Sequence, residues 1–395
     1  MTTTIDAKRD EEAALARVLS HAKLLFLLGV VEWHAGGCGS RPACYGGDPA
    51  EVGYLAAYAP TLLGATMLSG MMLVSGVKDS GRPVPWARVV SPVGLALGYQ
   101  LFDAVVVRPW LLRDPPVASA GHVARSARDR LACLFKKPRR RARAPSRNGD
   151  GRPQVWFLYS LALSRLLTKA PCLRPRKTLA AAGLALNFGA AWAWRAADDS
   201  RGVQARPPAG AAGSPAEWFD AVGVRCLTWT WLYVVGYVLV PKPALARVRA
   251  RVRADAASRA VASAAVAFTF VYSAARLSLN PSTHFFAHGW DWRDAPALFG
   301  RHVELWVVAT LGPVAVLATL PDADLGLLTE CGGHTLLPYL AHPVALKLLV
   351  RPATRRLLAG GPPGLVREAL ALLCPLGVLG GLHVASVVAT SPPAP

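Results

Sequence analysis

A tyrosine and a histidine interrupt the apolar run at residues 334–351, and their side chains could carry out acid–base chemistry. Tyr339 and His342 are three residues apart, a spacing that places them on the same face of a helix. An imidazole with an ordinary pKa near about 6.5 can take a proton from a hydroxyl, and a phenol can stabilise an oxyanion. The same spacing also fits a packing tyrosine and a histidine that bonds to a neighbouring helix.

Two more polar groups lie at the edges of apolar runs. His34 ends the first run, two residues after Glu32, so the two do not share a helical face. His34 is equally placed for catalysis and for capping the segment at the head groups. Arg88 enters the third run, a few residues after Arg82. An arginine there could snorkel to lipid phosphate or bind the phosphates of a nucleotide-bearing donor.

Composition indicates that long apolar helices position these residues. The 395-residue chain is 53% hydrophobic and 17% charged, and its mean hydropathy is +0.31. Ordinary soluble domains are more charged and less apolar. The formal net charge of +20 comes mainly from Lys and Arg in loops beside the apolar runs, where they orient helices and meet anionic lipid. We therefore expect a multi-pass membrane protein and no nucleic-acid partner.

The apolar runs predict an all-α bundle of about ten transmembrane helices that forms a single domain over residues 1–395. A run of about 20 apolar residues spans the hydrocarbon core as a helix. The N-terminus does not read as a cleaved signal peptide, so the first run is expected to be a retained anchor. The approximate limits of the runs are 16–36, 53–76, 87–112, 154–170, 178–196, 222–241, 259–279, 302–320, 334–351 and 367–390.

The loops add weaker expectations. Residues 113–153 include a basic run and are expected to be disordered, as a solvated loop, a lipid contact or a targeting signal. Arginine alternates over residues 247–253, as in a strand or as the polar start of the seventh helix. The basic short loops suggest that both termini are cytoplasmic, although the 113–153 loop would then lie outside. Of seven cysteines, only Cys38 and Cys44 share a short loop, where a disulfide would form only if the loop faces an oxidising lumen, and no Cys/His spacing indicates a metal site.

The order of several short motifs resembles the acyltransferase 3 family, most closely its fucose 4-O-acetyltransferase-type members. An Ala-Lys helix that ends in histidine is followed by Leu-Ser-Gly, Arg-x-x-x-Pro, Trp-Phe-Leu-x-x-Leu-Ala-Leu and Thr-Leu-x-x-Tyr-Leu-x-His, between residues 22 and 349. Members of that family are integral membrane proteins that move an acyl group, typically acetyl from acetyl-CoA, onto sugars or other hydroxyl acceptors.

Carried over by position, the resemblance implies roles for individual residues. His34 would be the catalytic base, supported by the late pair, and arginine would bind coenzyme A. Many relatives have a second arginine where this chain has Pro85, and Arg82 would substitute for it. The implied set is catalytic His34, His342 and Tyr339, donor-binding Arg88 and Arg82, and substrate-binding Trp156 and Ser69.

The sequence-based hypothesis is thus a membrane O-acyltransferase. Acetyl-CoA or another acyl-CoA would be a donor substrate and not a permanently bound cofactor, and a carbohydrate or lipid hydroxyl would be the acceptor. Membrane lipids would be its other partners, and which membrane holds it stays open. A transporter or flippase, in which buried histidines relay a solute or proton, is the main alternative, and a family member with only a structural role is a third.

Overall fold

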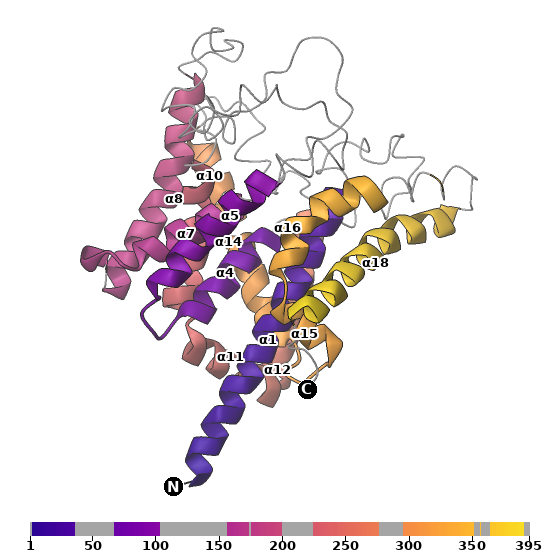
Figure 1. Ribbon diagram of the computed structural model, residues 1–395. Coiled ribbons are helices and arrows are strands. Elements are labelled where there is room, and N and C mark those ends of the chain that lie inside the picture. The colour runs from indigo at the N-terminus through magenta and orange to yellow at the C-terminus, as the bar shows by residue number, and fades with distance from the viewer. Residues whose placement is uncertain are drawn as a thin grey trace.

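The structure, a computed structural model, describes residues 2–35, 67–102, 156–173, 175–199, 224–275, 295–350, 356 and 364–390 (Figure 1). Every regular element among these residues is a helix, which confirms the all-α prediction for them. Each of the ten expected runs overlaps at least one helix, and the runs 222–241 and 334–351 each overlap an α-helix followed by a π-helical segment. The helices are α1 (Thr2–Ala35), α4 (Met67–Asp79), α5 (Trp86–Phe102), α7 (Trp156–Leu167), η3 (Pro171–Leu173), α8 (Arg176–Asp199), α10 (Val224–Val234), η5 (Val235–Leu239), α11 (Lys242–Ala254), α12 (Ala256–Ala275), α14 (Ala295–Thr319), α15 (Leu327–Gly333), α16 (Leu336–Ala345), η7 (Leu346–Val350) and α18 (Gly364–Thr390).

By length and composition, one described helix, Arg9–Glu32 of α1, could cross a membrane. A second span would result if α11 and α12, which meet at an angle of 113°, were counted together. Four further apolar segments are shorter, within α7, α10–η5, α14 and α18. The helical architecture and one or two candidate spans are therefore established, and the ten-span arrangement stays a proposal.

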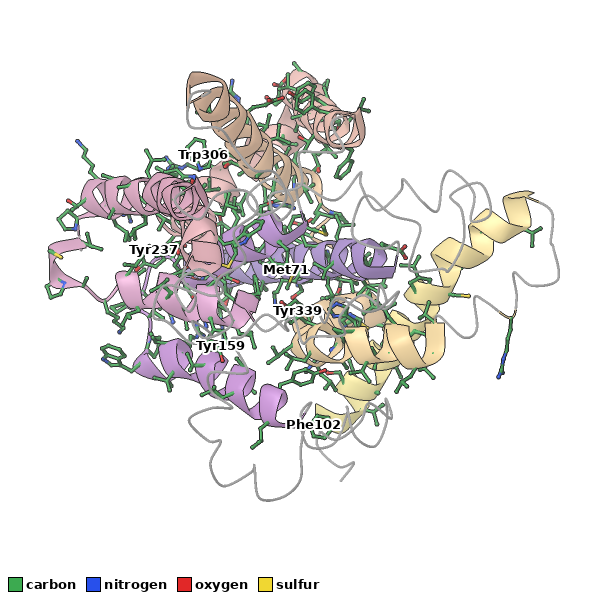
Figure 2. The ribbon with its side chains drawn as sticks, turned by 90° about the horizontal axis from the view of Figure 1, so that it is seen from above. Met71, Phe102, Tyr159, Tyr237, Trp306 and Tyr339 are labelled. Carbon is green, nitrogen blue, oxygen red and sulfur yellow. The ribbon has the colours of Figure 1, made fainter. Side chains whose placement is uncertain are left out.

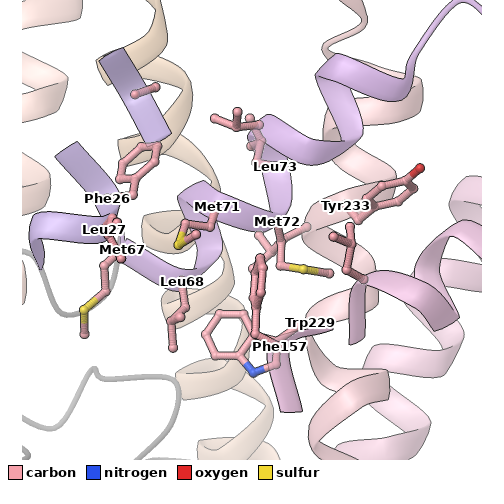
Figure 3. Packing of buried hydrophobic residues seen from close by; sticks show 14 of the residues in the cluster. Phe26, Leu27, Met67, Leu68, Met71, Met72, Leu73, Phe157, Trp229 and Tyr233 are labelled. Atoms are coloured by element: carbon pink, nitrogen blue, oxygen red, sulfur yellow. The ribbon is translucent and has the colours of Figure 1, made fainter. Parts of the chain in front are cut away.

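The helices α1 and α4 form the centre of the bundle. Helix α1 packs against α15 and α18, whereas α4 packs against α10 and η5. Buried apolar side chains from α1, α4, α7 and α10 meet between them (Figure 3). This cluster includes Phe26, Met72, Phe157 and Trp229, and its burial fixes the register of the helices that carry the candidate site residues.

Glycine allows α4 and η5 to touch backbone to backbone. A Cβ atom added at Gly76 would collide with the carbonyl oxygen of Tyr233, and one added at Gly236 would collide with that of Leu73. Small residues permit such close helix contacts, in membranes above all. The contact brings the end of α4 beside the end of α10.

Several short connections lie together at one end of the bundle, at the bottom in Figure 1. The backbone N–H of Lys242 donates to Ser80 Oγ at 3.0 Å, which joins the α4–α5 turn to the start of α11. Arg17 Nε donates to the carbonyl oxygen of Asp322 at 2.6 Å, which joins α1 to the α14–α15 connection. We call this the basic end, formed by residues 78–88, 165–173, 175–177, 240–259 and 320–326.

One expectation is corrected in detail. The arginine-rich run 247–253 is neither a strand nor the continuous start of the seventh helix, because α11 is a separate helix. Pro338 lies in the first turn of α16, where its missing N–H has no helical partner to lose. The 113–153 loop and the Cys38–Cys44 pair lie outside the described residues.

Candidate functional site

The carboxylate of Asp79, the last residue of α4, is the centre of a buried polar cluster at the basic end. Arg88 Nη1 lies 3.0 Å from Oδ1, and Arg165 Nε lies 2.7 Å from Oδ2. The phenol of Tyr233 also donates to Oδ2, at 3.2 Å. The Asp79 side chain is 1% exposed, so its burial requires these partners. The cluster joins the ends of α4, α5, α7 and α10.

A proline shapes this cluster from within α5. Pro92 has no N–H, so the carbonyl oxygen of Arg88, four residues earlier, receives no helical hydrogen bond from it. Arg165 Nη1 donates to that oxygen at 2.8 Å. One guanidinium therefore binds both the Asp79 carboxylate and the oxygen that Pro92 leaves for it. This gives the Arg-x-x-x-Pro motif a physical role, because it makes a docking point for Arg165.

The cluster carries an excess of positive charge. The Arg88 side chain is 50% exposed, in contrast to that of Arg165, which is 12% exposed. Partial desolvation and then the charge of Arg88 lower the pKa of the nearby Lys78 ammonium. The single carboxylate cannot neutralise three cations, so the outer part of the cluster attracts anions, and guanidinium groups suit phosphate in particular.

The second group of polar residues lies on α16. Tyr339 is 2% exposed and His342 is 1% exposed, so both face the interior from the one helical face that their spacing predicted. Their ring centroids are 5.9 Å apart, and the Tyr339 ring lies 5.4 Å from that of Phe157 on α7. Figure 2 shows Tyr339 directed toward the middle of the bundle.

A second proline sets the tautomer of His342. Pro343 removes the N–H that would bond to the carbonyl oxygen of Tyr339, four residues earlier. His342 Nδ1 lies 2.6 Å from that oxygen, and a carbonyl only accepts, so Nδ1 is the protonated nitrogen. In the neutral ring the lone pair is then on Nε2, which is the arrangement that a proton acceptor needs. The same bond would also serve a histidine that only caps the orphan carbonyl.

The two groups lie at different depths along α7. Phe157 contacts Tyr339, whereas Arg165 binds Asp79. Eight residues of helix separate them by about 12 Å, at a rise of about 1.5 Å per residue. The predicted donor-binding and catalytic residues are thus not one compact group, but a basic entrance and an interior pair connected by the same helix.

The remaining predicted site residues are only partly described. His34 lies in the last turn of α1 and Trp156 begins α7, but their side chains lie outside the described residues. Ser69 is fully buried within α4, where it faces packed helices. Arg82 is exposed in the α4–α5 turn, and it does not take part in the Asp79 cluster.

Sequence reasoning missed Asp79, Arg165 and Tyr233 as members of one cluster. The available signal was an acid at the end of an apolar helix, since a carboxylate there needs a partner. Sequence reasoning named Glu32 on α1 only as a neighbour of His34, and it did not single out His383 on α18, although both residues are buried. Glu32 Oε1 and both ring nitrogens of His383 have no hydrogen-bond partner in the described part of the chain.

Comparison with known proteins does not assign a function to this chain. No family model, no curated protein and no solved structure matched the chain.

Proposed function

We propose that the chain is a membrane-bound O-acyltransferase that moves an acyl group, with acetyl as the first candidate, from acyl-CoA to a hydroxyl of a carbohydrate or lipid. The resemblance to the acyltransferase 3 family suggested this activity. Two features together support it. Arginines gather around the buried Asp79 carboxylate at one end of the bundle, and His342 is held in one tautomer in the interior.

The basic end is suited to the donor. Coenzyme A carries several phosphate charges, and arginine binds phosphate through parallel hydrogen bonds. Arg88 is the half-exposed member of the Asp79 cluster and Arg82 is exposed beside it. Arg165, held by Asp79 and by the carbonyl oxygen of Arg88, keeps the cluster in place. The thioester end of the donor would extend inward from these residues.

The interior pair is suited to the chemistry. The acceptor hydroxyl oxygen attacks the thioester carbonyl carbon while its proton passes to an imidazole. The tetrahedral intermediate carries an oxyanion, which the Tyr339 phenol can stabilise in a dry site. When the carbon–sulfur bond breaks, the imidazolium returns the proton to the thiolate, which gives the ester and free CoA. His34 is the base that the resemblance implies, and His342 Nε2 is the one that the described geometry favours.

The test is acetyl transfer and CoA release by the purified full chain in detergent, with radiolabelled acetyl-CoA and a panel of glycan and lipid acceptors. His34→Ala and His342→Gln are compared with His383→Asn, which removes a buried histidine outside the proposed site. Loss of turnover in one of the first two variants identifies the base, provided that His383→Asn stays active and all variants keep their helical circular dichroism.

Donor binding has its own measurement. Arg88→Gln is expected to raise the KM for acetyl-CoA about tenfold or more, since a charge-assisted bond to phosphate is worth about 1.5–3 kcal/mol, with little change in kcat. Absence of both acetyl-CoA binding and CoA release in the folded wild type would contradict the enzyme proposal.

A transporter is the second candidate, favoured by the unpartnered Glu32 and His383. Polar groups without internal partners in candidate membrane helices mark ion or solute paths, and α1, α16 and α18 contact one another. In proteoliposomes, a proton or solute flux lost in Glu32→Gln and His383→Asn, with no acetyl transfer by the wild type, would favour this reading over the enzyme.

A further inference from the structure

The corner between α11 and α12 has a fixed position on the bundle. Leu245, Arg249 and Val252 form the buried face of α11. Arg249 donates to the carbonyl oxygens of Leu317 and, at 2.7 Å, of Leu320, where α14 ends. With α12 bent away at 113°, α11 lies across the end of the bundle while α12 runs along its side.

The outward face of this corner is basic. Arg247, Arg251 and Arg259 are exposed, and none of them forms an ion pair within the described ranges. The nearby carboxylates are already engaged. Asp322 pairs with Arg253 at 2.5 Å, and Asp255 accepts from the backbone N–H of Ser258 at 2.9 Å, where it caps α12. The corner therefore presents guanidinium groups whose charge is not balanced by its own acids.

Directly after the basic corner, α12 presents an apolar face. Val261, Phe268 and Val271 are 70%, 52% and 66% exposed, and their spacing places them on one side of the helix. Among the described elements α12 packs mainly on α14 and α11. Exposed contiguous apolar surface of this kind marks an interaction site.

We infer that the α11–α12 corner binds an anionic phospholipid. Its phosphate would lie against Arg247 and Arg251 on α11, and its acyl chains would run along Val261, Phe268 and Val271 on α12. The basic residues of α11 and the apolar face of α12 follow each other directly in the chain, on either side of the corner, and they match the two parts of such a molecule. A second copy of the chain would cover the apolar face but would bring the same arginines toward each other. The inference needs α12 to lie in the bilayer, and it does not depend on acyl transfer.

The test uses delipidated full chain in detergent, titrated with dioleoyl phosphatidylglycerol or dioleoyl phosphatidylcholine and followed by native mass spectrometry. Wild type is expected to retain phosphatidylglycerol in preference. The variant Arg247→Gln with Arg251→Gln removes two charges that hold no ion pair. Its affinity for phosphatidylglycerol should fall by about fivefold for each arginine. Arg176→Gln with Lys177→Gln, which removes two exposed charges from the start of α8, is the matched control and should keep the wild-type affinity.

The inference is overturned if both double variants lose affinity equally, or if wild type binds the two lipids equally. A dimer mass that persists in detergent and disappears in Phe268→Ser would also overturn it, since a second copy would then cover α12. Circular dichroism of each variant confirms that the helices are retained.

Discussion

At the scale of the residue, Asp79 connects more charged and polar side chains than its neighbours do, since it binds Arg88, Arg165 and Tyr233. It is the only carboxylate, within the described part of the chain, that binds two guanidinium groups, and Tyr233 closes the cluster from α10. Removal of one member of a buried charged group leaves the others desolvated without compensation. The acid therefore holds the arginines at the basic end in one arrangement, which a phosphate-bearing donor would meet already formed.

We expect Asp79→Asn to lower the free energy of unfolding by about 3 kcal/mol, because Arg165 then loses its counter-ion in a largely buried place. Denaturant unfolding in detergent measures this change. Glu330→Gln is the control, since Glu330 is exposed, and it should change the unfolding free energy by less than about 0.5 kcal/mol. Equal effects of the two substitutions would contradict the structural role of Asp79.

The ion pair of Asp322 with Arg253 predicts a pH dependence. Partial burial raises the pKa of Asp322, but the hydrogen bond and charge of Arg253 outweigh it and lower the pKa overall. A carboxyl with a lowered folded pKa stabilises the fold above its unfolded pKa of about 3.9 and loses this contribution as the pH falls through the folded pKa. Arg253→Gln should therefore be less stable than wild type above about pH 4, by at most about 1 kcal/mol, and the difference should vanish in stronger acid. A difference independent of pH would argue against the pair.

At the scale of the element, prolines have a constructive role. In α5 and in α16 a proline frees the carbonyl oxygen four residues earlier, and a side chain bonds to that oxygen, Arg165 in one case and His342 in the other. Helix-interior proline costs about 3 kcal/mol when the oxygen stays unbonded. The cost is partly offset here, and in return each side chain is held in a defined orientation.

This relation can be measured as a coupling energy. Pro92→Ala restores a backbone N–H that can bond to the carbonyl oxygen of Arg88. This N–H then competes with Arg165 Nη1 for that oxygen, so the hydrogen bond from Arg165 contributes less to stability. In the Pro92→Ala background, Arg165→Gln should therefore destabilise the fold by about 1 kcal/mol less than in wild type. A double-mutant cycle of unfolding free energies gives this number, and a coupling of zero would mean that Pro92 and Arg165 act independently.

Replacing glycine by alanine should have different effects at Gly76, which lies at the contact of α4 with α10 and η5, and at Gly98, which lies away from it. Gly76→Ala places a Cβ against the backbone of Tyr233, and the helices must separate, at a cost of about 3 kcal/mol or more. Gly98→Ala in α5 meets no atom within 4 Å, and it should be neutral or stabilising by up to about 1 kcal/mol, since alanine favours helix. Thermal unfolding of both variants in detergent measures the difference, and equal midpoints would contradict the close approach.

At the scale of the whole molecule, the sequence predicted what depends on local pattern. Apolar runs located the helices, and the spacing of Tyr339 and His342 indicated that they share one helical face. The Asp79 cluster was not predicted, because Asp79 and Arg165 are separated by 86 residues and only tertiary packing brings them together. In α11, arginine at every second position suggested a strand, although Leu245, Arg249 and Val252 recur with the period of a buried helical face.

The arrangement of the whole bundle predicts the membrane orientation. Short basic loops stay on the cytoplasmic side. The basic end contains the Asp79 cluster, α11 and the α14–α15 connection, so we expect this end to face the cytoplasm. Asp324 is exposed in that connection, just before α15, and Arg356 is exposed after η7, which continues α16. In Figure 1, α16 runs from α15 toward the opposite end of the bundle. In a chain without native cysteines, Asp324→Cys should react with a membrane-impermeant maleimide only after the cells are opened, and Arg356→Cys should react in intact cells or spheroplasts. Reaction of both positions from one face would mean that α16 and η7 do not cross the membrane, and the multi-pass arrangement would then fail at this helix.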